Sequence, residues 1–86
     1  MNIFPTGKFR KQLENLIRKD RKYAERVRKC MYLLEFDIQH PSLRLHKLGT
    51  MNFYSVSVDM KIRITLLLDA GEIILLNIGN HDIYKE

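Results

Sequence analysis

The chain of 86 residues has no tryptophan, only one cysteine, two prolines and four glycines. The lone cysteine, Cys30, has no second cysteine with which to form an internal disulfide, and no histidine stands near it at the spacing of a metal site. We therefore expect Cys30 to be a small buried apolar residue of a protein from a reducing compartment.

Long hydrophobic runs are also lacking. The most apolar stretch, residues 64–78, is interrupted by Asp69 and Glu72 and falls short of the roughly 20 apolar residues of a membrane span. The opening MNIFPTGKFR has no uninterrupted apolar segment of the kind found in signal peptides. We therefore expect a cytoplasmic protein without a membrane partner.

The chain does contain enough apolar residues for one core, and an excess of positive charge. Hydrophobic residues make up 45% of the sequence, as in ordinary globular proteins, and the length suits a single domain spanning residues 1–86. The net charge is +5, and residues 1–40 hold ten Lys and Arg against five Asp and Glu, whereas residues 41–86 hold five of each. This asymmetry suggests a polyanionic partner, although basic residues also occur on ordinary solvated helices.

Before Pro41 the hydrophobic period is that of helices. Apolar residues recur at helical spacing in two segments: Phe9, Leu13, Leu16 and Ile17, then Ala24, Val27, Met31 and Leu34. Thr6 suits the N-cap of the first helix, with Gly7 in its opening turn, and Asp20 suits the cap of the second. The pattern predicts an antiparallel helical hairpin, with a possible short strand before it at residues 2–4.

After Pro41 the period becomes two, which is typical of strands. The alternating apolar sets are Leu43 and Leu45, then Tyr54, Val56 and Val58, then Ile62, Ile64, Leu66 and Leu68, then Ile74, Leu76 and Ile78. Turns are expected at residues 49–52, 59–61 and 69–72. The sequence thus predicts an α+β fold, with the helical hairpin packed on one face of a mainly antiparallel twisted sheet of about four strands.

The other face of this sheet should be open and largely polar. Alternation places there Ser57, Asp59, Arg63, Thr65 and Asn77, with Arg44 or His46 beside them and with the apolar Leu67, Ile73 and Leu75. A sheet that is covered on one side and polar on the other is a candidate binding surface.

Four segments carry a resemblance to a known family: FRKQLENLIRKD, PSLRLHKLG, FYSVSVDMKIRITLLLD and IILLNIGNHDIYKE. Together, over nearly the whole chain, they resemble the RelE/ParE superfamily of toxins from type II toxin–antitoxin systems, in its RelE-like branch. The resemblance implies an endoribonuclease that needs no metal or other cofactor and cleaves mRNA, usually in the ribosomal A site, which inhibits translation. It also implies a cognate antitoxin that holds the toxin inactive and through which alone the toxin reaches operator DNA.

The resemblance also implies the catalytic positions. Nucleases of the family use a basic residue at the end of the first sheet strand, an Arg within the sheet, and His, Arg or aromatic groups at the C-terminal strand and tail. In this sequence those places hold His46 with Lys47, then Arg63, and then His81 with Tyr84. We assign supporting roles to Lys47, Lys61 and Asp82.

These residue types suit metal-free RNA cleavage. The ribose 2′-OH must lose a proton, the attacked phosphate must be stabilised, and the leaving 5′-oxygen must gain a proton. Histidine serves either proton transfer near neutral pH, so His81 and His46 are candidates for acid and base. Arg63 offers its planar fork to phosphate oxygens, and Tyr84 can donate a hydrogen bond or stack on a base.

Each assignment has an alternative. Arg63 could instead form a salt bridge with Asp59 or Asp82, His81 could be an ordinary tail residue, and Tyr84 could pack against the sheet edge. The adjacent His81 and Asp82 do not by themselves make a metal site.

The basic residues suit a second role, contact with ribosomal RNA (16S rRNA) through phosphates. The candidates are Lys8, Arg10, Lys11, Arg18, Lys19, Arg21, Lys22, Arg26, Arg28, Lys29 and Arg44.

Two other functions remain open. A ParE-type inhibitor of DNA gyrase needs no catalytic residues, and a catalytically inactive homologue would only bind its antitoxin. The gathering of His46, Arg63, His81 and Tyr84 favours the nuclease. In every case an antitoxin segment could cover the apolar residues of the open face.

Overall fold

The computed structural model describes residues 1–80 and residue 83. Its elements, in order, are β1 (Asn2–Pro5), α1 (Gly7–Lys19), α2 (Lys22–Phe36), a 3-10 helix (Pro41–Leu43), β2 (His46–Lys47), β3 (Phe53–Ser57), β4 (Arg63–Asp69) and β5 (Glu72–Gly79). The strands form one sheet in the order β1-β5-β4-β3-β2. The pair β1–β5 is parallel and the other three pairs are antiparallel. The predicted α+β fold is confirmed, including the short N-terminal strand.

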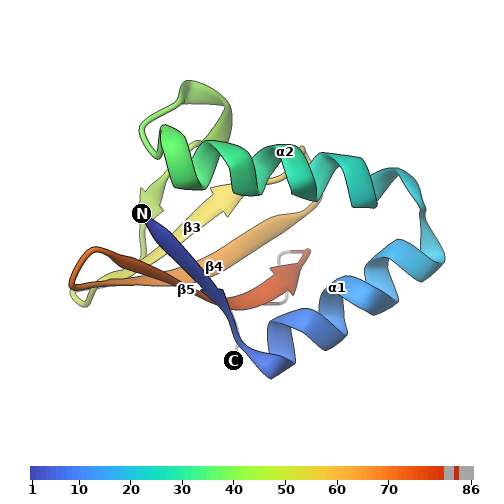
Figure 1. Cartoon of the computed structure of the whole chain (residues 1–86), viewed down its shortest axis with the longest axis horizontal. Coiled ribbons are helices and arrows are strands. Elements are labelled where there is room, and N and C mark those ends of the chain that lie inside the picture. The colour runs from blue at the N-terminus through green and yellow to red at the C-terminus, as the bar shows by residue number, and fades with distance from the viewer. Residues whose placement is uncertain (81–82, 84–86) are drawn as a thin grey trace.

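The helices cover one face of this sheet. Figure 1 shows α2 lying across the sheet and α1 running beside the end of β5. The core between them joins Phe9 of α1 and Val27 and Leu34 of α2 to Ile64 and Leu66 of β4. Within residues 1–80 and 83, no helix has the length and apolar character needed to cross a membrane.

Thr6 starts α1 as predicted. Its Oγ1 accepts a hydrogen bond from the backbone N–H of Phe9 (3.2 Å), which satisfies one of the N–H groups left unpaired at a helix start. The same hydroxyl donates to the carbonyl oxygen of Leu75 (2.8 Å). One side chain therefore begins α1 and ties that beginning to β5.

The connection to α2 follows the prediction in part. The Asp20 carboxylate accepts a hydrogen bond from the N–H of Lys22 (3.2 Å), the first residue of α2. The residue at the N-cap position is Arg21, however, and its side chain makes no capping bond. Asp20 therefore supports the start of α2 from one position further upstream.

The buried stripe of α2 is shifted from the predicted one. Ala24 is exposed, and the buried residues are Tyr23, Val27, Cys30 and Leu34. This set has helical spacing as well. Its burial is favoured over that of Ala24 because larger side chains bury more apolar area than alanine. The expected burial of Cys30 is confirmed, and this burial raises the pKa of the thiol to about 12 and leaves it unreactive.

The predicted strand beginning at Leu43 is wrong over its first residues. Pro41 opens a 3-10 turn in which the N–H of Ser42 donates to His40 Nδ1 (3.1 Å). Arg44 follows in the left-handed region (φ 48°, ψ 51°), and β2 contains only His46 and Lys47. Proline suits the first position of such a turn because it has no N–H to leave unpaired.

A β-bulge in β5 overturns part of the predicted sheet pattern. Thr65 pairs with Asn77, but the next residue, Leu66, pairs with Leu75. Leu76 is therefore the extra residue of the bulge, and the side-chain alternation changes phase there.

The bulge corrects the list of residues expected on the open face. Ile73 and Leu75 are fully buried against the helices, together with Ile78. Ile74, predicted to face the helices, instead pairs with Leu67. Leu67 is half-buried, and among the three apolar residues predicted on the open face it is the one whose side agrees with the register.

The predicted turns form where expected. Ala70 (φ 49°) and Gly71 (φ 80°) make a two-residue hairpin turn of the type in which both central residues are left-handed. In the turn between β3 and β4, Asp59 Oδ1 accepts the N–H groups of Lys61 (2.9 Å) and Ile62 (2.8 Å).

Candidate functional site

Polar side chains form two neighbouring rows on the sheet face that points away from the helices. The first row joins the register partners His46, Ser55, Thr65 and Asn77, and the second joins Ser57, Arg63 and Gly79. Register partners share a face, as do residues two apart on one strand. The structure therefore brings His46 and Arg63 to the same side of the sheet.

Arg63 is held in place at the start of β4. Its Nη1 donates a hydrogen bond to the hydroxyl of Ser57 on β3 (2.7 Å). A guanidinium has five N–H donors, so most of them stay available to a ligand. Among the described residues no carboxylate pairs with Arg63.

Asp59, considered above as a salt-bridge partner of Arg63, is directed toward α2 instead. The prediction that Asp59 lies on the open face is therefore wrong. Its Oδ2 accepts hydrogen bonds from the Tyr23 hydroxyl (2.6 Å) and from Arg26 Nη1 (2.6 Å), both on α2. Burial alone would raise the pKa of Asp59, but the bonds from Tyr23, from the turn N–H groups and from Arg26 lower it to about 2. The Asp59 carboxylate therefore binds groups of α2 and of the turn, and not Arg63.

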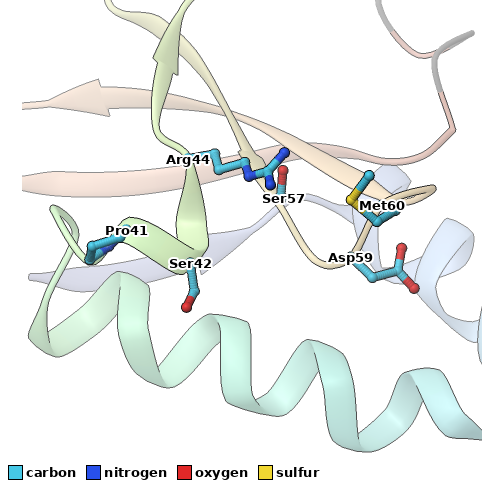
Figure 2. Close-up of a pocket in the computed structure, with 6 residues that line it drawn as sticks. All are labelled: Pro41, Ser42, Arg44, Ser57, Asp59 and Met60. Carbon is cyan, nitrogen blue, oxygen red and sulfur yellow. The ribbon is translucent and has the colours of Figure 1, made fainter.

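Arg44 lies near the second row, in the segment between the 3-10 helix and β2. It lines the same pocket as Ser57. Figure 2 shows its side chain extended toward Ser57. Two arginines thus approach one serine from opposite sides, and neither carries an ion pair among the residues that the structure describes.

His46 and Lys47 are both exposed on the edge strand β2, but they point to opposite faces. His46 pairs with Ser55, and Lys47 pairs with Tyr54, which packs against the core. From ordinary strand spacings the Cα atoms of His46 and Arg63 are about 12 Å apart. Geometry therefore groups His46, and not Lys47, with Arg63.

Lys61 and the basic helix residues lie elsewhere. Lys61 borders a hollow with Lys22 and Arg26 on the α2 side. The helical Lys and Arg candidates are all exposed, and several pair with acids on the helices, such as Arg18 with Glu14 and Arg28 with Glu25. They form the outer surface of the helical layer, separate from the polar sheet face.

The tail candidates His81, Asp82 and Tyr84 lie outside the described residues. Ile83 is described: it is buried, and its N–H donates to the carbonyl of Asn80 (3.2 Å). A Cβ added to Gly79 would come within 2.7 Å of Ile83 Cγ2. Since Gly79 is the register partner of Arg63, Ile83 packs over the same row as Arg63.

A polar network that the sequence pattern did not reveal supports the first row. Asn77 Nδ2 donates to the fully buried Thr65 Oγ1 (3.1 Å), and Gln12 Nε2 on α1 donates to Asn77 Oδ1 (3.4 Å). Gln12 Oε1 in turn accepts the N–H of Ile78 (3.0 Å). Ser57 was predicted on this face but not as the partner of Arg63, although the predicted turn at residues 59–61 already implied their pairing.

Within residues 1–80 and 83, no three His, Cys, Asp or Glu side chains gather as metal ligands. The polar residues that this face exposes at least in part are Arg63, His46 and Asn77, whereas Ser55, Ser57 and Thr65 are buried. The guanidinium and the imidazole can bind a phosphate and move a proton.

The same fold occurs in solved toxin structures. YafQ from E. coli strain BL21(DE3) superposes with a TM-score of 0.80 at 18% identity, over 99% of this chain and 98% of YafQ. The E. coli DinJ–YafQ toxin–antitoxin complex gives 0.76 at 18% identity, over 95% and 93%. The YoeB/ParE toxin from Agrobacterium tumefaciens gives 0.79 at 11% identity, over 94% and 99%. No protein-family model and no curated relative matches the chain. The fold implied by the sequence resemblance is confirmed.

Proposed function

We propose that the protein is a RelE-like toxin of a type II toxin–antitoxin system and that it is a metal-independent endoribonuclease acting on mRNA. The observation that carries this proposal is that His46 and Arg63 share one sheet face, with Arg44 beside the pocket at Ser57, and that none of the three has a carboxylate partner among the described residues. The shared fold with YafQ and the YoeB/ParE toxin supports it. The whole chain, residues 1–86, would act as one domain in the cytoplasm, where messages are translated.

The reaction we infer is an internal transesterification. A base removes the proton of the ribose 2′-OH, and the oxygen attacks the adjacent phosphorus. The bond to the 5′-oxygen breaks, that oxygen takes a proton from an acid, and a 2′,3′-cyclic phosphate remains. Arg63 stabilises the charge that builds on the phosphate oxygens, and its bond to Ser57 aims the guanidinium before substrate arrives.

The two proton transfers need two groups. His46 supplies one of them from the edge strand, on the same face as Arg63. We keep His81 as the second and Tyr84 as a group that contacts the base or the phosphate. We assign no step of the reaction to Lys47, which points to the other face of the sheet, or to Lys61, which lies on the α2 side.

The basic helices supply the second part of the proposal. Their exposed Lys and Arg side chains would contact ribosomal RNA through phosphates and position the polar face over the message. The antitoxin would be a separate protein, as DinJ is in the complex with YafQ, and operator DNA would be reached through it.

The test is induction of the wild-type chain, Arg63→Ala and His81→Ala at equal protein level, followed by growth curves and mapping of transcript 5′ ends. We expect growth arrest with new cuts inside translated messages for the wild type, and neither arrest nor cuts for the two variants. A variant at Asn15, an exposed helix residue outside both candidate sets, serves as the matched control.

Two other results would replace the proposal. Arrest without cuts that is indifferent to both substitutions would indicate a gyrase inhibitor of the ParE type, a name that the Agrobacterium neighbour also carries. Neither arrest nor cuts for the wild type would indicate a catalytically inactive homologue that only binds its antitoxin.

A further inference from the structure

An open pocket adjoins the polar face beside Ser57. It has a volume of 460 Å³ and is lined by Pro41, Ser42, Arg44, Ser57, Asp59 and Met60. This volume lies within the range of small-ligand sites. The lining combines two apolar side chains, two hydroxyls, one guanidinium and one carboxylate, and Figure 2 shows Arg44 and Met60 on either side of Ser57.

The electrostatics of this pocket favour an anion. Asp59 is its one acidic lining residue, and the carboxylate is occupied by Tyr23 and Arg26 on α2. Figure 2 shows this carboxylate directed away from Arg44. Within the described part of the chain the Arg44 guanidinium has no hydrogen-bond or ion-pair partner, so its charge faces the pocket unopposed.

The backbone of Arg44 is a second, independent observation. A non-glycine residue at φ 48° is held about 1–2 kcal/mol above its relaxed conformation. Such positions persist where the surrounding structure enforces them, and they cluster at ligand sites. Here the enforcing structure is the 3-10 turn, in which Arg44 N–H donates to the Pro41 carbonyl (3.2 Å).

Ser57 connects the pocket to the proposed site of cleavage. Its hydroxyl accepts the bond from Arg63, and its other side borders the pocket with Arg44. Ser57 is thus shared between Arg63, from which it accepts a hydrogen bond, and Arg44, with which it lines the pocket. A chain of phosphates held at Arg63 would therefore pass Arg44 next.

We propose that this pocket binds a nucleotide of single-stranded RNA next to the one whose phosphate is cleaved. Arg44 holds its phosphate, and the base lies against the thioether of Met60. Met60 is 77% exposed, and its flexible, polarizable side chain can adapt to the face of a base. The proposal rests on the proposed nuclease function and adds to it the position at which a base preference arises.

The first experiment measures binding without cleavage. A fluorescent 2′-O-methyl hexanucleotide has no 2′-OH to react, so its affinity for the purified chain reports the binding surface alone. The variants are Arg44→Gly, since glycine accepts φ 48° without strain, and Met60→Ala. Met51→Ala is the matched control, because Met51 is 72% exposed on a different loop.

We expect about tenfold weaker binding for Arg44→Gly and about three- to tenfold for Met60→Ala, with wild-type affinity for Met51→Ala. The salt dependence of binding should be shallower for Arg44→Gly only. Thermal melting of each variant shows whether the fold is intact. Hexanucleotide affinity equal to wild type in both pocket variants would overturn the pocket, as would a wild-type chain that does not bind the hexanucleotide.

The second experiment separates this proposal from the nuclease function. In mapped cuts, Met60→Ala should flatten the base preference at one position beside the cut while the other positions keep theirs. Arg63→Ala could abolish the cuts while Met60→Ala leaves their base preference unchanged. That result would contradict the proposed pocket but support the nuclease function. Weakened hexanucleotide binding by Arg44→Gly and Met60→Ala, together with no cuts by the wild type, would support the nucleotide site and contradict the nuclease function.

Discussion

The guanidinium of Arg63 donates to the hydroxyl of Ser57 at 2.7 Å, from β4 to its register partner on β3. Both residues lie on the sheet face opposite the helices, and Ser57 is buried there while Arg63 keeps part of its surface in contact with solvent. The serine therefore orients the arginine without neutralising its charge.

Substitutions at this pair should affect catalysis in graded fashion. Arg63→Ala should lower the cleavage rate of ribosome-bound message at least about 100-fold, because the developing charge on the phosphate loses its donors. Arg63→Lys should recover only part of the loss, since an ammonium group lacks the planar fork. Ser57→Ala should cost less, about three- to tenfold, by releasing the guanidinium from its orientation. Equal rates for wild type and Ser57→Ala would show that the bond has no positioning role.

His46 and Lys47 offer a test of the face assignment within one dipeptide. His46→Ala should lower the cleavage rate about 100-fold, as expected for loss of a proton-transfer group, whereas Lys47→Ala should change it less than about threefold. Single-turnover rates at several pH values would measure both effects, and His46→Ala should also change the shape of the pH profile. A larger loss for Lys47→Ala than for His46→Ala would reverse the assignment.

Asp59 should make folding stability depend on pH in acid. Its pKa in the folded chain is about 2, below the unfolded value of about 3.9, so folding favours the ionised form. The resulting stabilisation is present above the unfolded pKa and is lost as the pH falls from about 4 toward 2. Because the side chain is 17% exposed, we expect about 1–2 kcal/mol after allowing for solvent screening.

Urea unfolding at a series of pH values measures this contribution. Asp59→Asn should lower the free energy of unfolding at neutral pH and flatten its decline in acid. Asp37→Asn, at an exposed position, is the matched control. A wild-type and an Asp59→Asn profile that run parallel down to pH 2 would contradict the prediction.

The hairpin turn between β4 and β5 holds an unfavourable residue. Ala70 has φ 49° and is followed by Gly71, so Ala70→Asn creates the Asn-Gly pair preferred in such turns. We expect a gain of about 0.5–1 kcal/mol in the free energy of unfolding. The other alanine of the chain, Ala24, is exposed on α2, and Ala24→Asn there should instead destabilise by about 0.5 kcal/mol. A loss of stability on Ala70→Asn would contradict this account of the turn.

Gly79 and Ile83 should be energetically coupled. A methyl at Gly79 would meet Ile83 Cγ2 at 2.7 Å, so Gly79→Ala should destabilise by about 1–3 kcal/mol through overpacking. In an Ile83→Ala background the same change should cost much less, and a double-mutant cycle gives the difference. Additive effects would show that the two residues do not restrain each other.

Local chemistry in the sequence was sufficient for much of this fold. The Thr6 cap, the burial of Cys30 and the turn at residues 69–72 depend on side chains acting on their own backbone or on simple periodicity, and these predictions are confirmed. Alternation along the regular strand β4 also sufficed to put Arg63 on the face opposite its apolar neighbours Ile62 and Ile64. These features need only neighbours in the chain, so a single sequence contains the information.

Other features depended on contacts between distant segments. The bulge at Leu76 follows from how β5 fits β4 and from Gln12 of α1 binding the N–H of Ile78, and it reversed the predicted sides of Ile73 and Leu75. Asp59 is directed toward α2 because Tyr23 and Arg26, which are distant in the sequence, donate hydrogen bonds to its carboxylate. Pairing between strands and between layers is a competition among many long-range partners whose free energies differ little. Only the assembled tertiary structure resolves that competition, because each partner's benefit depends on all the others being in place.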